Sequence, residues 1–133
     1  MVESFSDPSN VAASFVEAFD VADREGIAAC LSADLVAEIT QADGSTAQIN
    51  GRDRFLASID ALDIATVHPS IKATQIAPVS SDQVMVMIEV RARRKGRSLH
   101  NFAAFLLSVC EGRITRLWMV EALPAESDLF WKA

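Results

Sequence analysis

His100 and Glu121 are the side chains of this sequence best suited to move a proton between them. A tight turn at Glu111-Gly112 predicts a hairpin whose two strands keep one constant register. In that register His100 lies diagonal to Glu121 on the same face, close enough for the two side chains to meet. A carboxylate beside an imidazole fixes its tautomer and stabilises its charged form, as a general acid or base requires. A structural His–Glu pair at the sheet rim or in a subunit contact is the alternative interpretation.

The opposite face of the same hairpin carries Asn101 and Trp118, which could bind a polar group of a ligand and stack on its ring. Tryptophan is equally common in subunit contacts, so an interface is the alternative. Met119 falls on the other face of its strand, while Phe15 and Phe19 recur at helical spacing and would line a cavity or pack in the core. We expect these five side chains to contact any bound ligand.

The sequence excludes tyrosine chemistry and predicts no metal site. The 133 residues include no Tyr, which excludes a phenolic acid, a Tyr nucleophile and an oxyanion held by a Tyr hydroxyl. Cys30 and Cys110 lie far apart without a Cys-x-x-Cys motif or a Cys/His cluster, so neither a metal site nor a disulfide framework is predicted. We expect a protein without metal or cofactor in the reducing cytoplasm.

The net charge argues against nucleic acid as a partner. The formal net charge of −6 opposes binding to nucleic acid phosphates. Five basic residues nevertheless crowd into positions 91–97, either as a solvated hairpin tip or as a docking patch for an anionic ligand or partner. Residues 1–5 lack the features of a signal peptide, and no apolar run approaches the ~18 residues of a membrane span, so neither secretion nor membrane insertion is expected.

Hydropathy indicates a covered apolar surface. The mean hydropathy of +0.22 is high for a small acidic domain whose helices and strands would each show one polar face. The extra apolar surface predicts a subunit interface, usually two-fold, or a ligand cavity.

Helix signals gather in the first half of the chain. Asp7-Pro8 offers a cap followed by proline at the first helical position, and Asp23 can cap a second helix that ends near positions 32–34. Gly51-Arg52 opens a third helix with one apolar stripe. These three helices would position Phe15 and Phe19.

Strand signals fill most of the remaining chain. The Asp43-Gly44 turn joins two short strands at 35–39 and 47–49. Longer strands are expected at about 67–79, 83–94, 98–110 and 113–122. Helices followed by an antiparallel meander predict an α+β fold in which helices cover one face of a curved sheet, with residues 1–133 as a single domain.

Several runs together resemble the nuclear transport factor 2-like superfamily, and its SnoaL-like and ketosteroid-isomerase-like branch most closely. The runs that carry the resemblance lie at 15–20, 23–34, 51–55 and 111–114. The resemblance implies a cone-shaped, curved antiparallel sheet, a half-barrel covered by three N-terminal helices around a mostly apolar pocket. It also implies a homodimer.

The resemblance further implies where chemistry would lie. The Tyr of ketosteroid-isomerase-like enzymes is absent, and the position of their second oxyanion donor falls at Ala104 or Ala103, neither of which can donate a hydrogen bond. SnoaL-like cyclases carry an acid near the end of the last strand, where the expected position is Ala122 and Glu121 stands one residue earlier. A one-residue offset reverses the face, so Glu121 could take that role only with a bulge in the strand.

Three interpretations remain open. The first is a protein that binds a small hydrophobic metabolite without its own chemistry. The second is a lyase, isomerase or cyclase that acts on a ring-containing metabolite and uses His100 and Glu121 for proton transfer. The third is a protein-interaction module.

Overall fold

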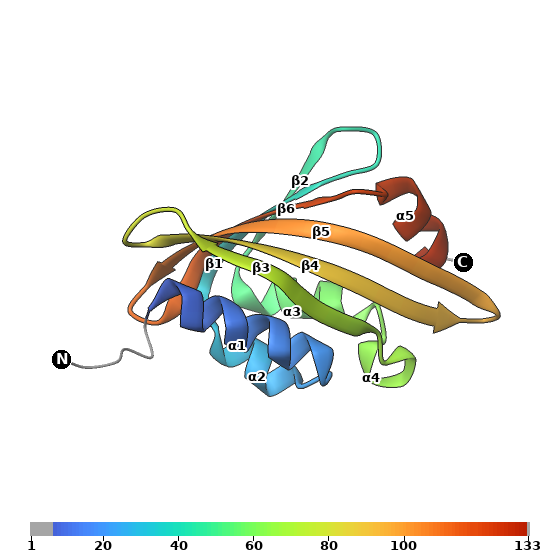
Figure 1. Cartoon of the computed structure of the whole chain (residues 1–133), viewed down its shortest axis with the longest axis horizontal. Helices are drawn as coiled ribbons and strands as arrows, with labels where there is room; N and C mark the ends of the chain where they lie inside the picture. Colours follow the sequence, from blue (N-terminus) through green and yellow to red (C-terminus); the bar gives the residue numbers. More distant parts are fainter. Residues whose placement is uncertain (1–6, 133) are drawn as a thin grey trace.

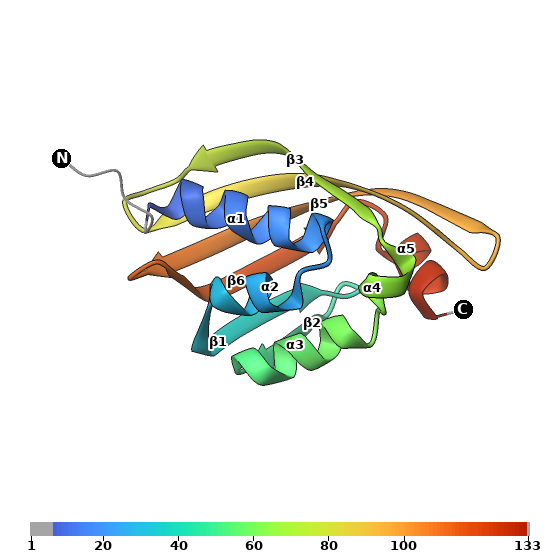
Figure 2. The same ribbon diagram turned by 90° about the horizontal axis from the view of Figure 1, so that it is seen from below.

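The computed structural model describes residues 7–132, which form a curved sheet with helices on one face and at one end (Figures 1 and 2). The sheet has six strands in the order β2-β1-β6-β5-β4-β3, and it stays open, with β2 and β3 as its edges. In chain order the elements are α1 (Pro8–Asp20), α2 (Arg24–Ala29), β1 (Leu31–Thr40), β2 (Thr46–Asn50), α3 (Arg52–Asp60), α4 (Ile64–Val67), β3 (Ser70–Pro78), β4 (Gln83–Arg94), β5 (Arg97–Cys110), β6 (Arg113–Glu121) and α5 (Pro124–Lys132).

Side-chain caps start the first two helices, as the sequence predicts. The Asp7 carboxylate accepts from the Ser9 backbone N–H at 3.1 Å with Pro8 in the first turn. Asp23 accepts from the Gly26 N–H at 3.0 Å. A Cβ at Gly26 would lie 2.5 Å from the Asp23 carboxylate, so glycine leaves room for this cap.

The α+β class and the curved sheet are confirmed, but the sheet is mixed rather than wholly antiparallel. The strands from β3 to β6 form the expected antiparallel meander. β1 pairs with β6 in parallel, with Ala37 opposite Leu117. A tight turn forces neighbouring strands to be antiparallel, whereas β1 and β6 are far apart in the chain and no turn sets their relative direction.

Several helices differ from the prediction. The second helix stops at Ala29, because Leu31 already begins β1 and is fully buried. Two further helices, α4 and α5, were not predicted. The N-terminal residues 1–5, where no signal peptide was expected, lie outside the described residues.

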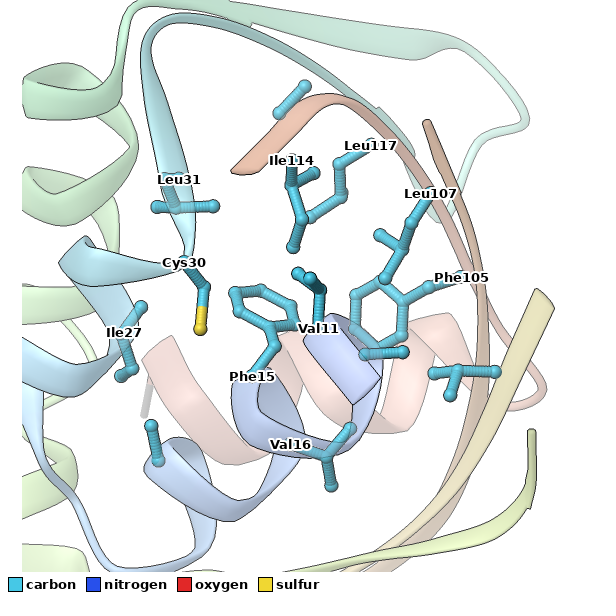
Figure 3. Close-up of a cluster of buried hydrophobic side chains, with 14 of the residues drawn as sticks. Val11, Phe15, Val16, Ile27, Cys30, Leu31, Phe105, Leu107, Ile114 and Leu117 are labelled. Carbon is cyan, nitrogen blue, oxygen red and sulfur yellow. The ribbon is translucent and has the colours of Figure 1, made fainter. Parts of the chain in front are cut away.

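The core lies between α1, α2 and the inner face of the sheet (Figure 3). The Phe15 ring meets the Phe105 ring edge-on, with 6.2 Å between the ring centroids. Burying each large apolar side chain contributes about 1.5–3 kcal/mol to folding. The fully buried apolar side chains include Phe15, Ile27, Leu31, Leu35, Leu107, Ile114 and Leu117. Among residues 7–132, no helix is long and apolar enough to cross a membrane.

Candidate functional site: a pocket behind a strand bulge

A bulge in β6 decides which side chains face inward. Near the turn, Cys110 pairs with Arg113, but the register shifts by one residue between Ser108 and Val109. Thr115 is the extra residue, and its hydroxyl donates to the Ser108 carbonyl oxygen at 3.3 Å. An extra residue on one strand reverses the faces of every position beyond it relative to the partner strand.

The predicted His100–Glu121 pair is therefore wrong. Glu121 lies opposite Ala103 and faces the helices, whereas His100 lies on the outer face of the sheet, which is the face turned away from α1, α2 and α3. His100 Nε2 lies 2.6 Å from the Glu89 carboxylate, which also accepts from Arg91 at 3.0 Å. The His100 side chain is 47% exposed. The predicted constant register fails because Thr115 forms a bulge, which was not foreseen because neither neighbour of Thr115 is a glycine.

A cavity of about 410 Å³ lies between the inner face of the sheet and helices α1, α3 and α5. Figure 2 shows α1, α2 and α3 over one face of the sheet, with α2 between the other two and α5 at one end. This volume lies within the range of small-molecule sites. Apolar side chains supply most of the wall, namely Phe15, Val16, Phe19, Ile39, Ile49, Phe55, Ile59, Leu62, Ile71, Ile88, Val90, Leu99, Ala103, Phe105 and Met119.

The charged side chains of the pocket gather toward α5. Along β6, Leu117 is fully buried in the core, Met119 lines the pocket, and Glu121 follows at the strand end. On α5, Asp128 and Lys132 line the same cavity and form an ion pair at 3.7 Å. The pocket thus has an apolar body and a polar end.

Glu121 is half-buried, and its environment alters its acidity. Burial is the main cause that raises the pKa of Glu121, and Asp128 raises it further. The Ser127 hydroxyl donates to Glu121 Oε2 at 2.9 Å and opposes the rise. Because burial outweighs this hydrogen bond, Glu121 holds its proton to a higher pH than a free glutamic acid and can donate it to a ligand oxygen.

Asn101 also lines the pocket, but its amide already bonds to the backbone. It is 2% exposed. Its Oδ1 accepts from the N–H groups of Phe102 at 2.9 Å and Leu123 at 3.0 Å. Its Nδ2 donates to the Leu123 carbonyl oxygen at 3.4 Å. Asn101 therefore ties the turn before α5 to β5.

A family model described as the SnoaL-like domain matches residues 12–117. The chain belongs to the SnoaL-like family. This match covers most of the chain and agrees with the expected nuclear transport factor 2-like relationship.

Solved structures share the fold of this SnoaL-like protein. A putative SnoaL-like polyketide cyclase from Jannaschia sp. CCS1 has a TM-score of 0.75 at 11% identity, covering 100% of this chain and 99% of the other. A Mycobacterium tuberculosis protein in complex with estradiol-17beta-hemisuccinate has a TM-score of 0.71 at 24% identity, over 85% and 92% of the two chains. A computationally designed 17-OHP binder has a TM-score of 0.69 at 24% identity, over 88% and 98%. No curated protein matches the sequence significantly.

The bulge gives Glu121 the orientation that its sequence position left in doubt. Without the extra residue Thr115, Glu121 would share a face with His100. With it, Glu121 lies on the pocket wall of the SnoaL-like domain, while Ala103 on the same wall offers no hydrogen-bond donor from its side chain.

Four of the five expected ligand contacts line the pocket, and Trp118 does not. Phe15, Phe19, Asn101 and Met119 face the cavity. Trp118 lies on the outer face, with the Arg116 guanidinium 4.9 Å from its ring centroid. The sequence did not point to Asp128, Trp131 or Lys132 as pocket residues, because no signal for α5 was recognised after the last strand.

The basic run at 91–97 contributes to the end of α5. Arg94 Nη1 donates to the Phe130 carbonyl oxygen at 2.8 Å, and Arg97 Nη1 donates to the Leu129 carbonyl oxygen at 3.4 Å. Cations near the last carbonyl groups of a helix stabilise it. Two of the five basic residues in this run thus hold α5 against the β4–β5 hairpin.

The outer face of the sheet carries a second, apolar surface. Met85, Met87, Phe102 and Val120 are 38–49% exposed there. An open groove of about 500 Å³ crosses this face, between Glu38 and Thr40 on β1 and Met85 on β4.

Proposed function

We propose that the protein binds one small, mostly apolar, ring-containing molecule in the inner pocket. The observation that carries this proposal is a cavity of about 410 Å³ whose wall is mostly apolar and whose charged side chains, Glu121 among them, gather toward α5. Removing apolar ligand surface from water favours binding by about 25 cal/mol per Å² before the costs of association. The M. tuberculosis protein in complex with estradiol-17beta-hemisuccinate and the designed 17-OHP binder, which share the fold, support a ligand of this class.

The polarity of the wall orients the ligand. Phe15 and Phe105 lie at the apolar body, where the ligand's rings would pack. Glu121 at the polar end would hydrogen-bond an oxygen of the ligand, such as a carbonyl or hydroxyl group. A buried polar side chain gains most from a ligand that satisfies its hydrogen bonds.

Calorimetric titration with estradiol-17beta-hemisuccinate and 17-OHP tests the proposal. Ala103 and Ala104 are neighbours on β5, but the first lines the inner pocket and the second lines the outer groove. We expect binding with a negative heat-capacity change. Ala103→Leu should weaken it about ten-fold, because overfilling a packed site costs about 1–3 kcal/mol. The matched variant Ala104→Leu should bind like the wild type.

Two results would count against the inner pocket. Equal losses of affinity in Ala103→Leu and Ala104→Leu would place the binding elsewhere. If neither probe binds and native mass spectrometry of the purified protein also finds no bound small molecule, the proposed function fails.

Proton transfer to the bound ligand is a second candidate function. Glu121 faces the pocket and its pKa is raised by burial, which is the direction of shift that favours a proton donor. The expected partnership with His100 is replaced by Glu121 alone. Exchange of deuterium into ketone substrates would test this candidate. Glu121→Gln should abolish the exchange and His100→Ala should leave it unchanged, whereas equal losses would remove the assignment.

We also propose that two copies associate through the outer face. Phe102 and Val120 expose apolar surface on neighbouring strands, and such surface is typical of a subunit contact. Sedimentation should give twice the chain mass of 14.4 kDa, and Phe102→Glu should give the single-chain mass. Leu129→Glu is the control, because Leu129 is 67% exposed and belongs to α5 rather than to the sheet. A wild type that sediments as a single chain would contradict this assembly and favour a different protein partner.

A further inference from the structure

Helix α5 closes the polar end of the pocket and is held there by its own contacts. Phe130 packs with Ala92 and Leu99 in a small apolar cluster separate from the main core. Arg94 and Arg97 donate to its last carbonyl groups from the β4–β5 hairpin. α5 therefore has a defined position relative to β6.

The start of α5 is also held by hydrogen bonds. Asn101 bonds both the N–H and the carbonyl oxygen of Leu123, immediately before the helix begins at Pro124. Pro124 at the first helical position adds a fixed backbone angle. Ser127 follows in the next turn and is 6% exposed.

Ser127 is aimed at Glu121. Its hydroxyl donates to Glu121 Oε2 at 2.9 Å, which links the helix to the pocket wall. A glutamic acid side chain has several rotatable bonds and loses entropy when it is held in place. A buried hydroxyl on a fixed helix can hold it in one orientation.

We propose that Ser127 is a positioning residue that directs Glu121 Oε1 toward the ligand by occupying Oε2. In the neutral form of Glu121, the oxygen that accepts from Ser127 is the carbonyl oxygen, so the proton lies on Oε1. Oε1–H then donates to the ligand's oxygen. This inference rests on the proposed function for the identity of the ligand, but the contact itself can be tested without any ligand.

Two neighbouring residues on α5 affect Glu121 in opposite directions. The Ser127 hydrogen bond favours the ionised form, whereas the negative charge of Asp128 disfavours it. Asp128 and Lys132 are the other charged side chains lining this pocket in the described part of the chain. Loss of Ser127 and loss of Asp128 should therefore move the acidity of Glu121 in opposite directions.

The test is a carbon-13 NMR titration of the Glu121 carboxyl in the ligand-free protein, with Glu121→Gln used to assign the resonance. We expect Ser127→Ala to raise the pKa of Glu121 further and Ser127→Thr, which keeps the hydroxyl, to restore the wild-type titration. Asp128→Asn should lower the pKa. General loosening of α5 would shift both variants in the same direction.

An unchanged or lowered Glu121 pKa in Ser127→Ala would overturn the positioning role, and so would a failure of Ser127→Thr to restore the titration. These outcomes do not depend on ligand binding. A protein that binds neither steroid probe but shows the opposite shifts would keep this inference and lose the proposed function.

Discussion

Truncation of two side chains on β6 should lower the free energy of unfolding by unequal amounts if the pocket is open where the structure places it. Leu117 and Met119 face the same way, two residues apart. Leu117 is 0% exposed and belongs to the packed core. Met119 is partly buried, packs against the core on one side and faces the cavity on the other.

The magnitudes follow from what each truncation leaves behind. Leu117→Ala loses about 0.8 kcal/mol of transfer free energy per buried carbon and also creates a new cavity, so it should lower the free energy of unfolding by about 3–5 kcal/mol. Met119→Ala only enlarges an existing cavity. It should lower the free energy of unfolding by about 1–2 kcal/mol, because the variant loses the transfer free energy of a partly buried side chain and the added cavity contribution is small.

Urea unfolding followed by circular dichroism measures both values, with the dependence on urea concentration expected to stay unchanged. Met119→Ala should also weaken binding of the steroid probes, and Leu117→Ala should not as long as it remains folded. Equal losses of stability in the two variants would show that Met119 is packed like Leu117, and the reasoning about an open pocket would be refuted.

Three further predictions concern acidity and thiol access. Burial raises the pKa of Glu121, so the wild type loses stability as pH rises from about 4.3, the pKa of a free glutamic acid, through the higher folded-state pKa. In urea titrations, Glu121→Gln should therefore gain stability relative to the wild type between pH 4 and pH 8. A stability difference that stays constant with pH would contradict this. The hydrogen bond with His100 is the main cause that lowers the pKa of Glu89, so the contribution of Glu89 to stability is lost as pH falls through its folded-state pKa. In thermal melts, Glu89→Gln should lose less stability than the wild type between pH 7 and pH 3. An equal loss in both proteins would argue against the contact. Cys110 is exposed, whereas Cys30 is buried and its pKa is raised by burial. A thiol reagent should label Cys110 in the native protein and Cys30 only on unfolding. Rapid labelling of both cysteines in the native protein would contradict the burial of Cys30.

Much of the fold could be predicted because its signals are local. The cap at Asp7, the cap at Asp23 and the turn at Asp43-Gly44 each depend on a few adjacent residues, and the structure contains a helix start or hairpin at each. The parallel pairing of β1 with β6 joins residues about 80 positions apart, such as Ala37 and Leu117. Such a pairing depends on the packing of the whole chain.

The site was harder to predict than the fold because one residue decides it. Thr115 is an ordinary strand residue, yet its place in the bulge moves Glu121 away from His100. Helix α5 brings Ser127 and Asp128 to the pocket, and its nine residues were not recognised as a helix. The side chains expected from helical spacing, Phe15 and Phe19, did reach the cavity, since that spacing is a regular property of the helix.

A ligand should occupy the inner pocket rather than the outer groove. Nuclear Overhauser effects between bound estradiol-17beta-hemisuccinate and assigned methyl groups of the protein test it most directly. We expect contacts to Ala103 and Ile88 on the pocket wall. Contacts to Ala104 and Val120 on the outer face, with none to Ala103 and Ile88, would contradict this placement.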